Sequence, residues 1–291
     1  MKSKYLILWC KQGQLANRII VFAHLIGFAH QYGYKLVNFT FYDYANIFPE
    51  LNKDFLCRYP KARFSFQLSL FFRKILYRII FCVGNKSRKC KNKFLSSYNY
   101  SNEEEVKLLT DSSCFEAFNR SKIILVNGWM LRDYKSLNKH KEIIKKIFSP
   151  DKKIQERILN FISNLRNLNS SLVGIHIRRG DYKHFRGGKY YFSFDIYVRI
   201  MKRMMELLNN NVTFLICTNE TIDIEIFNDL NCVLGLGSAI EDLYSLSECD
   251  FIIGPPSTFS IWASFYGNKP FYHINDASKL FFLKDFHVSE C

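Results

Sequence analysis

The chain has 291 residues, of which 48% are hydrophobic, so it is not a disordered protein and is long enough for two compact domains or one large one. Its nine cysteines are scattered and show neither a Cys-x-x-Cys pair nor the spacing of a zinc site, so we expect reduced thiols and no bound metal. The formal net charge of +15 resides in the first part of the chain, because residues 1–168 hold 30 Lys and Arg against 12 Asp and Glu, whereas residues 169–291 hold 11 against 14.

The first elements form a predicted βαβ unit. Residues 5–10 are a short apolar run typical of a strand, and residues 15–30 carry apolar side chains at the spacing of a helix. The helix is expected to end near Gly33, and residues 34–39 then predict a second strand. The opening apolar run is too short for a secretion signal, so we expect a cytoplasmic protein that starts at Met1.

A very hydrophobic segment follows at residues 64–83. It is nearly long enough to cross a bilayer, but Arg73, Lys74 and Arg78 lie in its middle, and each costs about 2.5 to 3.5 kcal/mol at a bilayer centre. A transmembrane helix is therefore not expected. We favour a helix that packs over its own domain, and we retain a second interpretation, in which residues 64–93 contact an anionic membrane peripherally from the cytoplasmic side.

The excess of Lys and Arg in residues 1–168 would attract an anionic partner. Nucleic acid, an acidic membrane surface and an anionic acceptor all qualify, and so does the plain interpretation that these side chains cover solvated faces. A non-catalytic nucleic-acid-binding protein is retained as an alternative function. No nucleic-acid-binding module is recognisable, however, so nucleic acid is not the expected partner.

From residue 123 onwards, strands and helices alternate. Residues 123–126 predict a strand, and residues 134–148 and 152–168 predict two amphipathic helices separated at Ser149 and Pro150. After residues 167–171 the sequence predicts strands at 172–177, 212–217, 251–253 and 270–273, and helices at 194–208, 239–247 and 258–266. This alternation favours an α/β protein with two domains, residues 1–168 and 169–291.

The segment His176-Ile-Arg-Arg-Gly-Asp-Tyr182 lies at the predicted end of a buried strand. Open α/β sheets bind ligands at the carboxyl ends of their strands, and alternation places His176 and Arg178 on the side opposite to Ile177. The guanidinium of Arg178 offers a planar fork of donors that suits phosphate oxygens. An exposed turn with internal ion pairing is the alternative for such a run, but the preceding strand and histidine favour a ligand site.

A second candidate region spans residues 241–267 and contains a predicted strand that ends in Gly254-Pro-Pro. Ser257 and Thr258 then begin a helix, where free backbone N–H groups and the helix dipole favour an anion such as phosphate. The same two residues would serve as ordinary helix caps, and both roles are compatible. Asp242 begins the preceding helix, where its carboxylate could cap the helix or accept two donors from the edge of a guanine base.

A third candidate is the loop Gly13-Gln-Leu-Ala-Asn-Arg18, which joins the first predicted strand to its helix. Its single glycine and early asparagine make a weak motif, and Asn17 could be an ordinary cap. Its place at the start of an α/β domain, facing a second domain across a cleft, makes Gly13 and Asn17 candidates to close the ligand site.

Together these segments resemble the bacterial α-1,2-fucosyltransferases of glycosyltransferase family 11. The resemblance rests on the motif from His176 to Tyr182, on Gly187-Gly-Lys-Tyr-Tyr191 before a long helix, and on the Glu-Asp-Leu and Gly-Pro-Pro-Ser-Thr-Phe-Ser stretches of residues 241–267. It is specific over residues 172–270 and thinner over residues 1–40. Where many relatives have Ser-Asp-Asp after a strand, this chain has Thr218-Asn-Glu220, and no role is assigned to these three residues.

The resemblance implies a GT-B-like pair of Rossmann-type domains with a nucleotide-sugar cleft between them. It also implies an inverting galactoside α-1,2-fucosyltransferase that uses GDP-fucose, a galactose-terminated glycan acceptor, and neither a metal nor a separate cofactor. By this resemblance, Arg178 would bind the β-phosphate, His176 would lie against the nucleoside, and Asp242 would bind guanine. Ser257 and Thr258 would bind phosphate, and Gly13 and Asn17 would close the site.

No Asp-x-Asp motif for a nucleotide-bound metal is evident, so positive groups of the protein must neutralise the diphosphate. Arg178 is the first candidate and Arg179 the second, together with the helix end at Ser257. The general base is not identified, and Asp181 and His176 are the candidates. The same fold acting on another nucleotide sugar, or forming another fucose linkage, remains the alternative.

Overall fold

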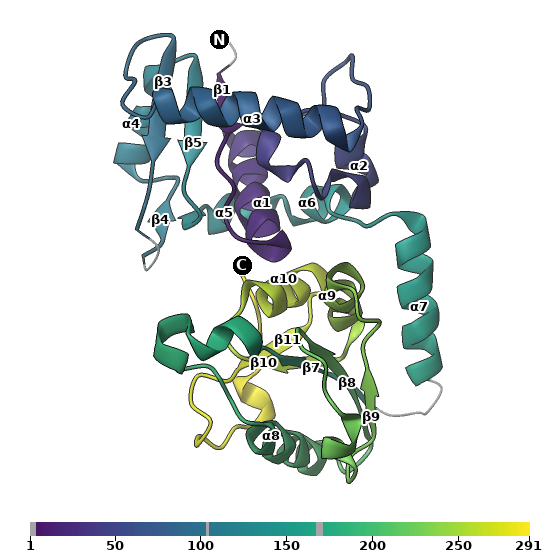
Figure 1. The fold of residues 1–291 in the computed structure, drawn as a ribbon. Coiled ribbons are helices and arrows are strands. Elements are labelled where there is room, and N and C mark those ends of the chain that lie inside the picture. Colours follow the sequence, from purple (N-terminus) through teal and green to yellow (C-terminus); the bar gives the residue numbers. More distant parts are fainter. Residues whose placement is uncertain (1–3, 103–104, 167–170) are drawn as a thin grey trace. The chain divides into compact units, whose positions relative to one another are not determined.

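The computed structural model describes residues 4–102, 105–166 and 171–291, and it divides the chain into two compact units, Met1–Asp151 and Lys152–Cys291 (Figure 1). The domain boundary predicted after residue 168 lies outside the described residues. Helix α7 (Lys152–Arg166), which we predicted in the N-terminal domain, contacts strand β7 (Ser171–Ile177) and belongs to the second unit. The reason is its apolar stripe, Ile158, Ile162 and Leu165, which is buried.

The first unit is built on a parallel sheet of four strands in the order β2-β1-β5-β3. The strands are β1 (Tyr5–Leu8), β2 (Lys35–Asn38), β3 (Leu95–Asn99) and β5 (Ile123–Asn127). Strands β4 (Lys107–Leu108) and β6 (Leu131–Arg132) form a separate parallel pair. The sequence predicted three of the four central strands, and β3 was missed because the pattern between residues 41 and 100 has no clear period.

Six helices accompany this sheet in the described part of the first unit. They are α1 (Leu15–Tyr32), α2 (Pro49–Asn52), α3 (Leu70–Lys86), α4 (Ser112–Arg120), α5 (Tyr134–Lys139) and α6 (Lys141–Ile147). Helix α1 is almost entirely buried and ends at Gly33, which adopts a left-handed conformation with φ 73°. The predicted βαβ unit is therefore confirmed. The single helix predicted at residues 134–148 is instead two helices, interrupted at His140.

The second unit contains a sheet of six strands in the order β12-β11-β10-β7-β8-β9, parallel except for β12. Besides β7, the strands are β8 (Val212–Thr218), β9 (Cys232–Leu234), β10 (Phe251–Gly254), β11 (Pro270–His273) and β12 (His287–Val288). All four strands predicted in this region are confirmed. Strands that are buried in a parallel sheet have continuous apolar sequences, and for this reason the four strands could be predicted from the sequence.

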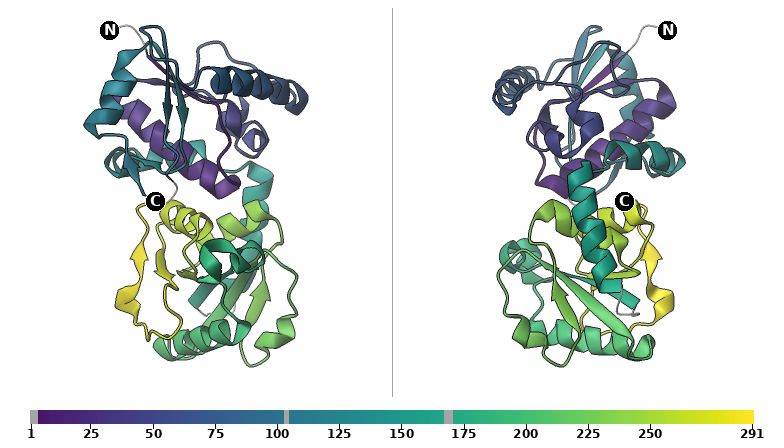
Figure 2. Two further views of the ribbon diagram at one scale, coloured as in Figure 1. Left: turned by 60° about the vertical axis from the view of Figure 1, so that its left-hand side comes forward. Right: turned by 90° about the vertical axis from the view of Figure 1, so that its right-hand side faces the viewer.

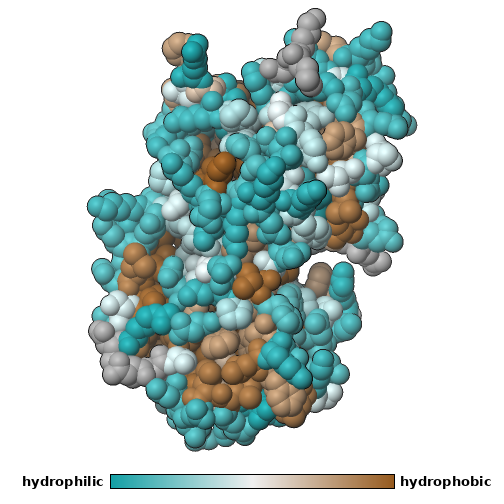
Figure 3. All heavy atoms as spheres, turned by 180° about the vertical axis from the view of Figure 1, so that it is seen from behind, coloured by the Kyte–Doolittle hydropathy of each residue, from teal (hydrophilic) through white to brown (hydrophobic). Residues whose placement is uncertain are grey.

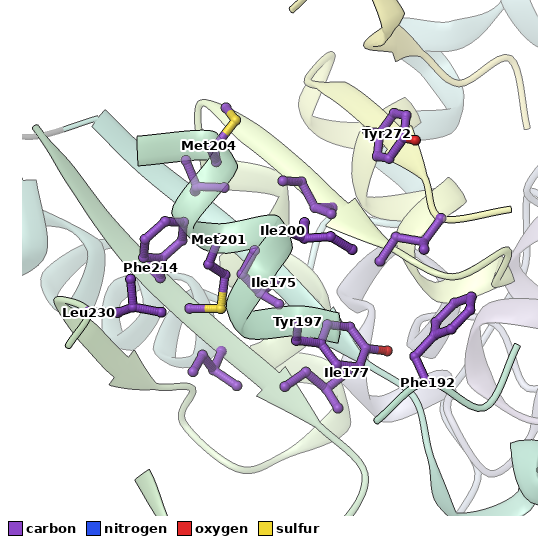
Figure 4. Packing of buried hydrophobic residues seen from close by; sticks show 14 of the residues in the cluster. Ile175, Ile177, Phe192, Tyr197, Ile200, Met201, Met204, Phe214, Leu230 and Tyr272 are labelled. Atoms are coloured by element: carbon purple, nitrogen blue, oxygen red, sulfur yellow. The ribbon is translucent and has the colours of Figure 1, made fainter. Parts of the chain in front are cut away.

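Helices cover both faces of this second sheet (Figures 1 and 2). Helix α8 (Phe194–Leu207) lies on one face, and helices α9 (Ala239–Glu248) and α10 (Thr258–Gly267) lie on the other. Alternation along β7 sends Ile175 and Ile177 into the core beneath α8, where Tyr197 and Met201 of the helix meet them (Figure 4). His176 therefore faces the opposite side, as predicted.

The surface of each unit carries both hydrophobic and hydrophilic side chains. On the face shown in Figure 3, apolar side chains gather into a broad patch over part of the second unit, whereas the visible part of the first unit is mostly hydrophilic. Among the residues that the structure describes, no helix combines the length and the hydrophobicity that a bilayer span requires.

Candidate functional site

The predicted ligand residues of the second unit lie at one edge of its sheet. Strands β9, β8, β7 and β10 are parallel neighbours, so the loops that follow them emerge at the same edge. Arg178 and Asp181 follow β7, Asp242 follows β9, and Ser257 follows β10. This is the edge at which open α/β sheets bind their ligands.

His176 is buried beneath helix α10, with only 4% of its surface exposed. Its Nδ1 lies 2.6 Å from Oγ of Ser260, and its ring packs on Phe259 with a centroid distance of 4.9 Å. Gly254 permits this approach, since a Cβ there would lie 3.0 Å from Cβ of His176. Burial, assisted by Arg178, lowers the pKa of His176 to about 3, so the imidazole is neutral at ordinary pH and a weak base.

Arg178 is only partly engaged by the protein. Its guanidinium donates to Oδ2 of Asp181 at 2.8 Å and lies 5.4 Å from the ring centroid of Tyr182. Its Nε is buried and has no hydrogen-bond partner in the described part of the chain. A buried donor without a partner is costly, and an anionic ligand would satisfy it.

Arg179 makes more protein contacts than Arg178 and helps to hold the loop after β7, although its buried Nε likewise makes no hydrogen bond among the described residues. Its guanidinium pairs with Oε1 of Glu220 at 2.6 Å, donates to the carbonyl of Phe192 at 3.0 Å, and lies 4.3 Å from the ring centroid of Phe194. Its backbone N–H donates to Oδ1 of Asn219 at 3.1 Å. Asn219 and Glu220, for which the sequence analysis proposed no role, therefore support the loop that carries Arg178.

Two loops of the site are joined directly. The hydroxyl of Tyr182, which is buried, donates to the carbonyl of Pro256 at 2.8 Å and so ties the Arg178 loop to the segment before α10. Ser257 is the N-cap of α10 and accepts the N–H of Phe259 at 3.3 Å. The structure thus brings His176, Arg178 and Asp181 to the start of α10, where Ser257 and Thr258 lie.

Asp242 lies in the first turn of α9, with Ser238 rather than Asp242 as the N-cap. Its Oδ1 accepts the N–H of Gly237 at 3.1 Å, and a Cβ on Gly235 would lie only 2.4 Å from the same oxygen. Burial raises the pKa of Asp242 to about 6, which is well above the ordinary value for aspartate. The loop therefore holds a desolvated carboxylate in a fixed position.

Gly13 and Asn17 lie in the first unit, in the loop between β1 and α1. Gly13 has φ 61°, a conformation that favours glycine, and a Cβ there would lie 2.0 Å from the side-chain amide of Asn17. Arg18 fixes this loop by donating from Nε to the carbonyl of Gly13 at 2.9 Å and pairing with Oδ1 of Asp43 at 2.7 Å. The expected roles of Gly13 and Asn17 toward a ligand stay predictions.

Replacing Ser260 with alanine should lower the free energy of unfolding by about 1–3 kcal/mol, because His176 loses its buried partner. The measurement is urea unfolding of the Ser260→Ala variant beside the exposed Ser278→Ala control, which should change little. Equal unfolding midpoints for the two variants would argue against a structural role for the His176–Ser260 contact.

The site as a whole presents positive charge and backbone donors at one sheet edge. Arg178 supplies the cation, and the first turn of α10 supplies backbone N–H groups and the positive end of its dipole. In the described part of the chain, no three His, Cys, Asp or Glu side chains form a group that could hold a metal ion. The arrangement is suited to binding a phosphate-bearing ligand.

Comparisons with known proteins agree with this geometry. The model of a family described as glycosyl transferase family 11 matches residues 120–284. No curated protein matches the chain.

Three solved structures are similar in fold. A mutant of FUT1 from Arabidopsis thaliana in complex with GDP aligns with 13% identity and a TM-score of 0.58, over 96% of this chain and 72% of that one. Fucosyltransferase NodZ from Bradyrhizobium aligns with 15% identity and a TM-score of 0.54, over 97% and 98%. POFUT1 in complex with GDP-fucose aligns with 12% identity and a TM-score of 0.51, over 92% and 94%. The prediction of a GT-B-like α/β protein with two Rossmann-type domains is confirmed.

Proposed function

The chain belongs to glycosyl transferase family 11, and we propose that it transfers fucose from GDP-fucose to a galactoside hydroxyl in α-1,2 linkage. The donor is supported by the structures of similar fold, which include complexes with GDP and with GDP-fucose. One of them, NodZ, is named an α-1,6-fucosyltransferase. The α-1,2 linkage and the galactoside acceptor rest instead on the resemblance of residues 172–270 to bacterial α-1,2-fucosyltransferases.

The observation that carries the proposal is the state of Arg178. Its Nε is buried and has no hydrogen-bond partner in the segments that the structure describes, and its loop is tied by Tyr182 to the segment that starts α10. A diphosphate bound here would accept from the guanidinium and from the backbone N–H groups at Ser257 and Thr258. The same donors would stabilise the charge that grows on GDP as the sugar leaves.

Besides binding of the diphosphate, the proposed reaction requires a bond cleavage, a nucleophilic attack and a proton transfer. The bond between the anomeric carbon and the diphosphate breaks, and its electron pair leaves with GDP, while a galactoside hydroxyl attacks the opposite face of the sugar. The hydroxyl proton passes to a base. Asp181 remains the candidate for that base, since the pKa of about 3 makes His176 a poor proton acceptor. His176 is better suited to supporting the site as a neutral, packed ring.

Asp242 is proposed to bind the guanine base. A carboxylate can accept two parallel N–H donors, and such donors are found along the edge of guanine. The raised pKa of Asp242 fits this role, because a desolvated carboxylate gains most from a pair of donors. Uracil and thymine lack that pair of donors, so the proposal predicts preference for GDP.

The acceptor side is proposed to lie at the carboxyl edge of the sheet in the first unit. Amide side chains line this edge: Nε2 of Gln12 donates to Oδ1 of Asn127 at 2.6 Å. Beside them, Lys11 pairs with Asp43 at 2.6 Å and lies 4.1 Å from the ring centroid of Tyr42. Polar groups next to an aromatic face are what a sugar ring requires.

The proposed transfer should not depend on a divalent metal, because Arg178 and the α10 helix end supply the positive charge. We expect the rate of transfer from GDP-fucose to a terminal galactoside to be unchanged, within about twofold, by excess EDTA. The assay uses a small panel of terminal galactosides, with product linkage determined by NMR. Complete loss of activity on EDTA treatment, restored by Mg²⁺ or Mn²⁺, would reject the metal-independent mechanism, and no turnover with any galactoside would reject the proposed acceptor.

A further inference from the structure

Helix α3 packs on the first unit through one side and exposes apolar side chains on the other. Its inward side is anchored by Arg73, which is buried and donates from Nη2 to the carbonyl of Asn52 at 2.8 Å and from Nε to the carbonyl of Leu68 at 3.0 Å. Near its other end a Cβ on Gly84 would lie 2.2 Å from the ring of Trp9, so the helix backbone rests against that ring. The expectation of a helix packed over its own domain is correct for this side.

The outward side of α3 carries a continuous apolar ridge. Phe71, Ile75, Ile79 and Val83 recur every four residues and are between 38% and 66% exposed. Further exposed apolar side chains lie at the start of the helix and just before it, at Phe64, Phe66, Leu70 and Phe72. Single exposed apolar residues are common, but a contiguous group of this kind marks a binding surface.

The segment of the chain that contains the ridge is basic. Residues 55–102 contain eleven Lys and Arg and no Asp or Glu. Lys74, Arg78 and Lys86 are exposed and lie one residue before or three residues beyond members of the ridge, so they border it along the helix. This combination of apolar and cationic side chains complements a surface that is itself apolar beneath a layer of anions.

A basic hollow is lined in part by residues that follow α3 in the chain. It has a volume of about 590 Å³, and its lining includes Arg88, Lys89, Lys91 and Arg120. Tyr98 and Asn99 add polar groups to the same hollow. Four cations around one concavity are suited to phosphate groups.

We propose that the outward face of α3 binds the surface of an anionic phospholipid membrane. The ridge from Phe71 to Val83 enters the boundary between headgroups and acyl chains, while Lys74, Arg78 and the basic hollow pair with lipid phosphates. The buried guanidinium of Arg73 keeps the helix oriented with this ridge outward. The surface belongs to the first unit, so the inference does not depend on the donor or acceptor of the proposed reaction.

The test is flotation of the full chain with vesicles of phosphatidylcholine alone, or of phosphatidylcholine mixed with phosphatidylglycerol, at low and high salt. We expect binding to the anionic vesicles that weakens with salt, and little binding to the neutral ones. The Ile79→Asp variant should bind the anionic vesicles at least about tenfold more weakly, since it removes an inserted side chain and adds an anion. The Lys74→Ser and Arg78→Ser double variant should bind them several-fold more weakly.

The matched control is Leu159→Asp, which introduces the same charge at a residue that is 52% exposed on α7. It should bind vesicles as the unaltered protein does, and thermal unfolding verifies that every variant is folded. The proposal is overturned if the unaltered chain does not float with anionic vesicles, or if Ile79→Asp and Leu159→Asp bind them equally. It is also overturned if the face proves to be a contact between copies of the chain, that is, if Ile79→Asp dissociates an oligomer and vesicles do not compete.

Discussion

Replacing Arg178 with alanine should reduce kcat/KM for transfer from GDP-fucose by about 100-fold to 1000-fold while leaving the protein folded. The variant removes the guanidinium that the proposed mechanism assigns to the leaving diphosphate. Its cost to stability should be small, because Asp181, the ion-pair partner, is 62% exposed and the buried Nε has no hydrogen-bond partner among the described residues. The assay is initial-rate kinetics with a terminal galactoside, together with thermal unfolding.

Two further variants sharpen this experiment. Lys183→Ala removes a nearby exposed cation from the same loop and should retain nearly full activity. Arg178→Lys keeps the charge but not the planar fork, so its activity should fall between those of alanine and arginine. If Arg178→Ala and Lys183→Ala turned over at the same rate, the diphosphate would have to be held elsewhere.

Replacing Asp242 with asparagine should have two opposite effects. Affinity for GDP should fall by about 10-fold to 100-fold, because an amide cannot accept two N–H donors as the carboxylate does. The unliganded protein should become more stable by about 1–3 kcal/mol at neutral pH, because a desolvated charge is removed from a residue that is 6% exposed. The hydrogen bond from Gly237 can persist, since asparagine keeps an acceptor oxygen at that position.

The sign of the pH dependence follows from the raised pKa of about 6. Between the ordinary pKa of aspartate and this value, the native state binds more protons than the unfolded state, so stability falls as pH rises through this window. GDP affinity should do the reverse and rise as Asp242 ionises through pH 6. The Asn variant should lack both changes.

Thermal shift with GDP, UDP and dTDP between pH 5 and pH 8 measures both effects. The control is Asp229→Asn, which replaces an exposed carboxylate and should alter neither the preference for GDP nor its pH dependence. Equal stabilisation of the unaltered protein by all three nucleotides would contradict the assignment of Asp242 to guanine and favour another nucleotide sugar as donor.

Much of the second unit could be predicted because its information is local. The strand from 172 to 177 is a buried apolar run, and a period of two residues was enough to place His176 and Ile177 on opposite faces. The N-cap at Ser257 was equally readable, since a hydroxyl before an apolar helix is a local signal.

The features that could not be predicted from the sequence depend on contacts between distant segments. Ser260 supports His176 from 84 residues away, and Glu220 supports Arg179 across the neighbouring strand, so neither role leaves a periodic trace. The buried and exposed sides of α3 could not be distinguished from the sequence either. Arg73 and Lys74 are adjacent in the chain, yet Arg73 is buried and Lys74 is exposed. The cytoplasmic location and the acceptor remain predictions.

The ion pair between Arg178 and Asp181 has a consequence for turnover under the proposed mechanism. A carboxylate already occupies the guanidinium in the unliganded protein, at 2.8 Å, so the diphosphate must displace it on arrival. When GDP leaves, the same carboxylate can form its ion pair with the guanidinium again. Asp181 would thus act as an internal competitor of the product, reducing affinity for GDP and thereby favouring its release after each transfer.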